Sequence, residues 1–141
     1  MTDYTRKLCT NMSKFPIIIA GGRDFNDIRL ALKSLKKYCI KRNLKPSDIQ
    51  VVSGTAKGAD FIGEFIAKRL SIELKQFMPD WTRFGKLAGF KRNEEMAMYA
   101  SENSGGCLVF WDGQSKGSLN MIELAKEYGL DYEVINYERN T

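Results

Sequence analysis

Residues 53–60, SGTAKGAD, and the two segments that flank them decide the fold of this chain. Residues 49–52, IQVV, are rich in β-branched side chains, which favours a strand. Residues 61–70 follow with apolar side chains at helical spacing. The order of strand, glycine-rich loop and helix presents backbone N–H groups and the positive end of a helix to an anion. We therefore expect a phosphate-bearing ligand, most simply a nucleotide, to lie across this loop.

The loop contains residue types that suit anion binding. Gly54 and Gly58 allow the backbone to turn sharply and to approach a ligand closely. Ser53, Thr55 and Lys57 add hydroxyl groups and one positive charge. The alternative is a tight strand-to-helix turn that binds nothing, because short glycine motifs are weak signals on their own.

Strands and helices are expected to alternate on both sides of this unit. Apolar or β-branched runs predict further strands at residues 15–20, 72–78, 107–111 and 132–136. Helices are predicted after Asn26 or Asp27 and at residues 61–70, 86–100 and 119–128, with a loop at residues 80–85. Such alternation is typical of right-handed βαβ units. The expected fold class is therefore α/β, a Rossmann-like three-layer αβα domain with a mainly parallel sheet of about five strands.

A single domain over residues 15–137 accounts for most of the chain. Residues 1–14 are polar and lack periodicity, so we expect a flexible N-terminal extension. Residues 138–141 are expected to be a C-terminal tail that frays. The helix at residues 61–70 is expected to bury one face, made of Ala59, Ile62, Phe65, Ile66 and Leu70.

The composition excludes several kinds of chemistry. The chain has no histidine, which removes the usual general base, Ser–His and Cys–His dyads and most zinc sites. Cys9, Cys39 and Cys107 are widely scattered, as free thiols of a reducing compartment are. No apolar stretch is long enough to cross a bilayer, and the N-terminus lacks a signal-peptide pattern. We expect a cytoplasmic protein with no membrane partner, no metal and no cofactor.

Three glycine-bearing loops, at residues 21–25, 53–60 and 112–118, each follow a predicted strand. In an open parallel sheet, ligands bind beyond the carboxyl ends of the strands, so these loops should converge. Neither the GxGxxG fingerprint nor the Gly-Lys-Ser/Thr ending of a P-loop is present, which predicts a nucleotide site of another kind. The candidate ligand-binding residues are Gly21, Gly22, Arg23, Asp24, Ser53, Gly54, Thr55, Lys57, Gly58, Asp60, Arg92, Asn93, Asp112, Gly113, Ser115, Gly117 and Ser118.

Arg92 and Asn93 lie on the predicted helix at residues 86–100. An arginine there could hold a phosphate in bidentate fashion, and the asparagine could bond a ribose or a base edge. The alternative is a pair on the helix surface. Trp81, Phe84 and Trp111 could stack on a base or fill the rim, and core packing is favoured for Trp111 because it ends a buried strand.

A basic stripe at four-residue spacing marks the first predicted helix: Arg29, Lys33, Lys37 and Lys41. Such a stripe could contact nucleic-acid phosphates. A solvated helix face is the favoured interpretation.

Residues 19–25, IAGGRDF, and residues 52–60, VSGTAKGAD, occur together with RNEEM at residues 92–96 and FWDG at residues 110–113. This ordered set resembles the SLOG superfamily, named for the Smf/DprA DNA-processing proteins and the LOG cytokinin-activating enzymes. It is most similar to the YspA-like, YpsA-related branch of small stand-alone domains, over residues 16–135. The resemblance implies a Rossmann-like fold, a pocket for nucleotides or nucleotide-derived molecules, and a homodimer or higher homo-oligomer. Such domains occur in bacteria and their phages, with proposed roles in conflict and signalling.

The same resemblance bears on catalysis. LOG-type phosphoribohydrolases hydrolyse an N-glycosidic bond with the arginine of Arg-Lys-x-x-Met and the glutamate of Gly-Gly-x-Gly-Thr-x-x-Glu. Residues 92–96 match the first motif with Asn93 in the lysine's place, whereas Asn120 or Met121 takes the place of the glutamate. Developing oxocarbenium charge needs a carboxylate. The favoured hypothesis is therefore a domain that binds a nucleotide or nucleotide-derived signalling molecule to sense, sequester or process it.

Two alternatives stay open. The first is a LOG-like nucleotide phosphoribohydrolase with Arg92 and Glu95 as candidate catalytic residues, and with Glu94 or Asp112 as other replacements for the missing carboxylate. The second is a DprA-like nucleic-acid binder that uses the basic stripe.

Overall fold

A five-stranded, wholly parallel sheet forms the centre of the computed structural model, which describes residues 14–139. The strands are β1 (Phe15–Gly21), β2 (Ile49–Ser53), β3 (Glu73–Gln76), β4 (Gly106–Trp111) and β5 (Asp131–Asn136). Their order is β3-β2-β1-β4-β5, and all four neighbouring pairs are parallel. The expected α/β class is confirmed. The expected extension at residues 1–14 lies almost wholly outside the described residues.

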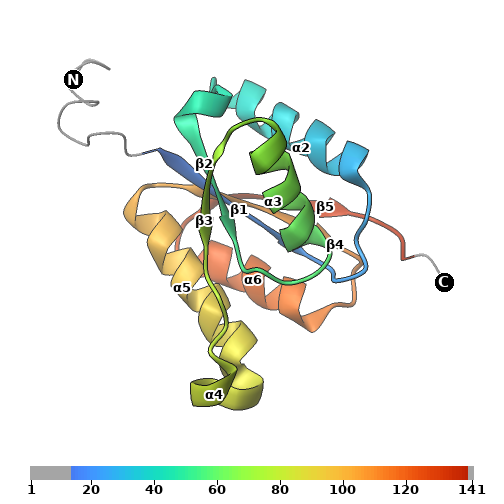
Figure 1. The fold of residues 1–141 in the computed structure, drawn as a ribbon, viewed down its shortest axis with the longest axis vertical. Coiled ribbons are helices and arrows are strands. Elements are labelled where there is room, and N and C mark those ends of the chain that lie inside the picture. The colour runs from blue at the N-terminus through green and yellow to red at the C-terminus, as the bar shows by residue number, and fades with distance from the viewer. Residues whose placement is uncertain (1–13, 140–141) are drawn as a thin grey trace.

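Helices cover both faces of this sheet, as Figure 1 shows. Helices α2 (Ile28–Lys41) and α3 (Ala59–Arg69) pack on one face, and α5 (Ala88–Glu102) and α6 (Lys116–Glu127) on the other. Short helices complete the chain: α4 (Trp81–Phe84) and 3-10 turns at Pro46–Asp48 and Gly85–Leu87. The arrangement is the Rossmann-like three-layer domain that the sequence predicts.

The alternation of side chains along β1 shows how the two cores form. Ile17 and Ile19 join the cluster beneath α2 and α3, whereas Ile18 and Ala20 join the cluster beneath α5 and α6. Strands with apolar side chains on both faces belong in the middle of a parallel sheet. This burial fixes the register, and with it the place where each strand ends.

The buried face of α3 differs from the expected one. Phe65 and Leu70 are 40% and 43% exposed, although both were predicted to be buried. The helix packs against the sheet through small residues, and a Cβ at Gly63 would lie 2.9 Å from Cγ2 of Ile19. This close approach turns the face that contains Gly63 and Ala67 toward the core and leaves Phe65 in solvent.

Element ends also differ where side chains cap a helix. The expected loop at residues 80–85 contains α4, because Asp80 Oδ1 accepts the N–H of Arg83 at 3.0 Å. Helix α6 begins at Lys116 rather than residue 119, since Ser115 caps it. Strand β3 covers only Glu73–Gln76 of the predicted residues 72–78.

Two further findings concern the cysteines and the length of the apolar helices. Cys39 and Cys107 are buried free thiols, and Cys9 lies outside the described residues. No helix within residues 14–139 is long and apolar enough to cross a bilayer.

Candidate functional site

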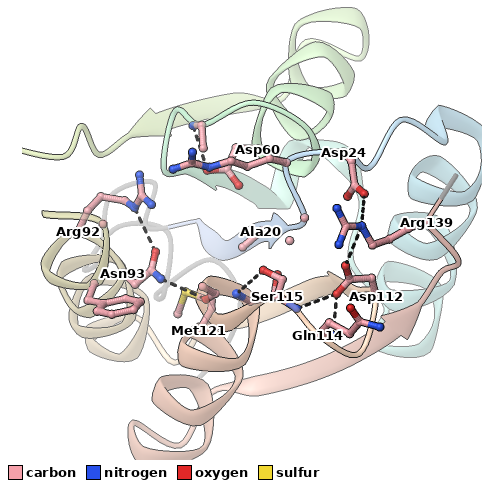
Figure 2. Close-up of a pocket in the computed structure, with 18 of the residues that line it drawn as sticks. Ala20, Asp24, Asp60, Arg92, Asn93, Asp112, Gln114, Ser115, Met121 and Arg139 are labelled. Carbon is pink, nitrogen blue, oxygen red and sulfur yellow. Dashed lines mark hydrogen bonds and ion pairs between the residues drawn. The ribbon is translucent and has the colours of Figure 1, made fainter. Parts of the chain in front are cut away.

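A cleft of about 590 Å³ opens beyond the carboxyl ends of β1 and β4, the central neighbours at which the chain switches direction across the sheet. Figure 2 shows side chains converging on it from both sides of the sheet edge. Its lining includes Ala20, Gly21, Gly22, Arg23, Asp24, Ala56, Asp60, Trp81, Lys86, Gly89, Phe90, Arg92, Asn93, Asp112, Gln114, Ser115, Gly117, Ser118, Met121 and Arg139.

The structure brings most of the predicted site residues together at this cleft. Those that line it are Gly21, Gly22, Arg23, Asp24, Asp60, Arg92, Asn93, Asp112, Ser115, Gly117 and Ser118. Those outside its lining are Ser53, Gly54, Thr55, Lys57, Gly58, Gly113 and the candidate catalytic Glu95. Sequence reasoning missed Lys86, Phe90, Gln114, Met121 and Arg139 as lining residues.

The loop at residues 53–60 uses its own side chains to bind its own backbone. Thr55 donates its N–H to Ser53 Oγ at 3.0 Å, and Ala56 donates to Asp60 Oδ2 at 3.1 Å. Gly58 lies so close to the first loop that a Cβ there would be 2.2 Å from the carbonyl oxygen of Gly22. The loop therefore sets the positions of its neighbours, and several of its donors are already occupied.

Asp60 is a buried carboxyl group at the edge of the cleft. It is 4% exposed, and it lies in the first turn of α3. Burial raises its pKa to about 6, while the hydrogen bond from Ala56 and the charge of Arg92 act in the opposite direction. The negative charge of Glu64 nearby adds to the increase. A carboxyl with a raised pKa in a cleft is a candidate functional group.

Arg92 reaches the cleft from α5, and the loop at residues 53–60 holds its side chain in place. Its Nη1 donates to the carbonyl oxygen of Gly54 at 2.5 Å, and its Nε donates to Asn93 Oδ1 at 3.1 Å. A Cβ at Gly54 would lie 2.8 Å from Arg92 Cδ, so glycine makes room for the side chain. Burial lowers the pKa of Arg92, the negative charge of Asp60 acts in the opposite direction, and the positive charge of Arg23 adds a further decrease. Two cations that repel each other across one space create a site for an anion.

Asn93 connects α5 to the first turns of α6. It is 6% exposed, and its Nδ2 donates to Asn120 Oδ1 at 2.9 Å and to the carbonyl oxygen of Gly117 at 3.5 Å. In the sequence, Asn120 or Met121 takes the place of the LOG glutamate, and of these two only Met121 lines the cleft. Asn93 and Asn120 form a pair of neutral amides between α5 and α6.

The N-terminus of α6 opens into the cleft between Asn93 and Asp112. Ser115 accepts the N–H of Ser118 at 3.3 Å, and Asp112 Oδ1 accepts the N–H groups of Gln114 and Ser115 at 2.8 Å each. These backbone hydrogen bonds lower the pKa of Asp112. A Cβ at Gly117 would have nothing within 4 Å, so this turn of backbone faces open space.

Aromatic side chains line the end of the cleft near α4. Trp81 is 54% exposed and Phe90 is 44% exposed, and both line the cleft together with Lys86. Figure 1 shows α4 projecting beyond the sheet next to the start of α5. Exposed aromatic faces suit the stacking of a base. Another predicted stacking residue, Trp111, is packed against the core, and its Nε1 donates to the carbonyl oxygen of Ser115 at 3.1 Å.

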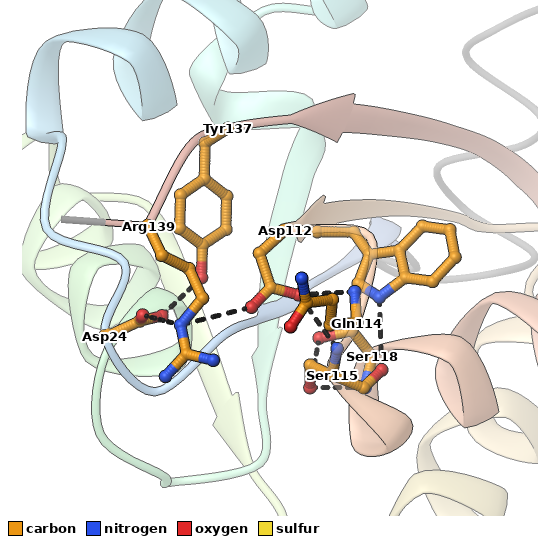
Figure 3. Close-up of polar contacts among 8 residues, drawn as sticks. Asp24, Asp112, Gln114, Ser115, Ser118, Tyr137 and Arg139 are labelled. Atoms are coloured by element: carbon orange, nitrogen blue, oxygen red, sulfur yellow. Dashed lines mark hydrogen bonds and ion pairs between the residues drawn. The ribbon is translucent and has the colours of Figure 1, made fainter. Parts of the chain in front are cut away.

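Arg139, which follows β5, lines the opposite side of the cleft. Arg139 Nε donates to Asp24 Oδ2 at 2.8 Å and lies 3.5 Å from Asp112 Oδ2, and Tyr137 donates its O–H to Asp24 Oδ1 at 2.5 Å (Figure 3). The Tyr137 bond is the main reason that the pKa of Asp24 is lowered. Arg139 belongs to the expected C-terminal tail, and these contacts join it to the loops that follow β1 and β4. No local pattern marks it, because Asp24 is 115 residues away in the chain.

Within residues 14–139, no group of three or more histidine, cysteine, aspartate or glutamate residues is placed to hold a metal ion.

Comparison with known proteins finds a family match for one part of the chain. Residues 15–84 match the family described as YspA, cpYpsA-related SLOG (YAcAr), which confirms the SLOG resemblance of the two glycine motifs. Arg92 and the loop at residues 112–118 lie outside this match. No curated protein matches the sequence.

The fold is also similar to that of a solved structure. The X-ray structure of DNA processing protein A (DprA) from Streptococcus pneumoniae aligns with a TM-score of 0.60 at 18% identity. The alignment covers 86% of this chain and 50% of that one, so this chain spans about half its length. At this identity the similarity shows the shared fold.

Proposed function

We propose that the cleft binds a nucleotide or nucleotide-derived molecule, with its phosphate at the N-terminus of α6. The observation that carries the proposal is that the open backbone at Gly117 shares one cleft with Arg23 and Arg92. The first N–H groups of an α-helix have no partner within the helix, and the helix dipole favours an anion there. Within residues 14–139 neither guanidinium group forms a salt bridge, although Asp60 lies near Arg92, and the two groups supply the matching charge.

The rest of the nucleotide fits the remaining walls. Trp81 and Phe90 offer faces on which a base stacks, and Lys86 is beside them. Asn93 is buried and ordered by Asn120, so it is a fixed polar group for a sugar hydroxyl. The cleft volume lies within the ordinary range for small-molecule sites. The SLOG match supports a nucleotide-related role in general terms, and sensing, sequestering or processing such a ligand is our proposal for its role.

Native mass spectrometry of the purified protein, followed by denaturing extraction, tests this proposal. We expect a nucleotide-derived mass to accompany the folded chain, and Arg92→Gln to reduce its occupancy at least tenfold, the scale of one charge-assisted hydrogen bond. Arg69→Gln is the matched control, because Arg69 lies at the other end of α3 and outside the cleft lining. Equal occupancy in both variants would contradict the proposal. Self-association stays a prediction, and the same spectra report it.

A hydrolase remains a second candidate because of one carboxyl group. Glu95 is exposed and outside the cleft lining, and the pKa of Asp112 is lowered, which makes it a poor proton donor. Asp60 combines cleft access with a pKa of about 6. Chromatography of nucleoside 5′-monophosphates after incubation with the protein tests this candidate. Release of free base by the unmodified protein, but not by Asp60→Asn, would support a hydrolase. Intact nucleotide after incubation with the unmodified protein would reject it.

A nucleic-acid binder is favoured only by the basic stripe. Arg29, Lys33, Lys37 and Lys41 are all exposed on α2, and none of them lines the cleft. A gel-shift series in rising salt tests this use of the stripe. Absence of any shift at low salt would reject it, because phosphate contacts by surface lysines are strongest there.

A further inference from the structure

Arg139 adds to the cleft a guanidinium group that the proposed phosphate site does not use. The segment after β5 is held in place by Tyr137, whose N–H donates to the carbonyl oxygen of Trp111 at 3.1 Å and whose O–H donates to Asp24. Arg139 then bonds Asp24 and approaches Asp112. Its side chain is thus fixed by loops that follow two neighbouring strands.

These contacts leave the outer part of the guanidinium group available. Within residues 14–139, the hydrogen bond and both ion pairs of Arg139 all involve Nε. Figure 2 shows the guanidinium reaching into the cleft from the side opposite Arg92. An arginine that is held at Nε presents Nη1 and Nη2 as a fork, which matches the geometry of a phosphate.

The local charges favour an anion at this fork. The Asp112 side chain is only 4% exposed and its Oδ1 already accepts two backbone N–H groups, whereas the Arg139 side chain is 56% exposed. Asp24 is likewise bonded through both carboxylate oxygens, to Tyr137 and Arg139. The guanidinium group of Arg139 is therefore more accessible to a ligand in the cleft than the carboxylates of Asp24 and Asp112, which hold that group in position.

We propose that Arg139 is a ligand-binding residue that recognises a second anionic group, so that the cleft prefers nucleoside diphosphates to monophosphates. This inference rests on the proposed function. Trp81 is on α4, next to the start of α5, and Arg92 is farther along that helix. Arg139 lies across the cleft from Arg92. A base at Trp81 and a first phosphate between Arg92 and Gly117 place the next phosphoryl group toward Arg139.

Isothermal titration calorimetry with the 5′-mono- and 5′-diphosphates of adenosine, guanosine, cytidine and uridine tests this assignment. For the base that binds, we expect the diphosphate to bind at least about tenfold more tightly than its monophosphate. Arg139→Gln should remove that preference, because it should weaken diphosphate binding at least about tenfold more than monophosphate binding. Arg69→Gln, with the same loss of charge outside the cleft, should keep the preference. Thermal unfolding of each variant without ligand verifies that it folds.

The possible outcomes distinguish a failure of the proposed role of Arg139 from a failure of the proposed nucleotide binding. If monophosphates and diphosphates bind equally well, or if Arg139→Gln weakens both equally, the role of Arg139 is wrong while nucleotide binding stands. If none of the eight nucleotides binds the unmodified protein, both proposals fail for these probes.

Discussion

At the residue scale, two glycines of the site serve different purposes. Gly58 has a φ of +77° and lies against the backbone of Gly22, so the fold itself requires a glycine there. Gly117 lies in the first turn of α6 with open space beside it, so the fold tolerates a side chain. If a phosphate binds at the N-terminus of α6, a methyl group at residue 117 obstructs the bound phosphate and does not disturb the fold.

Alanine substitutions at these glycines should therefore separate stability from binding. Gly58→Ala should destabilise the protein by about 3 kcal/mol or more, through backbone strain and overlap with Gly22. Gly117→Ala should leave the free energy of unfolding unchanged or raise it by about 0.4–1 kcal/mol, because alanine restricts the unfolded chain. Gly117→Ala should nevertheless weaken nucleotide binding. Urea unfolding and calorimetry measure the two effects, and normal affinity in Gly117→Ala would contradict the phosphate position.

Asp60 gives the protein a distinct dependence of stability on pH. Its folded-state pKa of about 6 exceeds the ordinary aspartate value of 3.8, so the folded protein binds the proton more tightly than the unfolded chain does. Stability from this group is complete below pH 3.8 and falls as pH rises to about 6, by up to about 3 kcal/mol. The absence of histidine leaves this pH range free of competing side chains with ordinary pKa values near 6.

Asp60→Asn should remove this pH dependence. The amide oxygen can still accept the N–H of Ala56, so we expect the variant to fold and its unfolding free energy to be nearly flat between pH 4.5 and about 6.5. Urea denaturation at half-unit pH steps compares the two proteins. An unchanged slope in Asp60→Asn would show that another group is responsible.

At the element scale, α4 is the part of the site that the sequence pattern did not predict. Its four residues are too few to show helical periodicity, and only the Asp80 cap distinguishes them from a loop. The long elements were predictable, because β1 and β4 are largely apolar runs, β2 is rich in β-branched side chains, and the helices have a polar face. The side of α3 that contacts the sheet was not, since the close approach of Gly63 to Ile19 is a tertiary contact.

The position of α4 predicts a role in binding the base. Trp81→Ala should lower nucleotide affinity by about 1–3 kcal/mol, the usual range for base stacking, and should leave affinity for ribose 5-phosphate unchanged. Leu87→Ala is a suitable control, because Leu87 is 57% exposed near α4 and does not line the cleft. Equal losses for nucleotide and ribose 5-phosphate would place the contact elsewhere.

At the scale of the whole molecule, the sequence predicted that the glycine-bearing loops meet at one edge of the sheet. It did not predict that Arg139 lines the cleft between them. The carboxyl ends of parallel strands lie at the same edge of the sheet. The loops at residues 21–25 and 112–118 therefore have to meet there once the Rossmann-like fold is predicted. The contacts of Arg139 with Asp24 and Asp112 depend on how the chain returns after β5. Sequence spacing has no information about such a contact.

The position of the phosphate is the central claim, and an amide NMR titration with the 5′-monophosphates of the four bases tests it most directly. We predict that the backbone N–H signals of Gly117 and Ser118 shift most, because they lie in the helix turn that opens into the cleft. Arg92→Gln should reduce these shifts, and Arg69→Gln should not. Largest shifts within residues 54–58, or along the basic stripe of α2, would contradict the account.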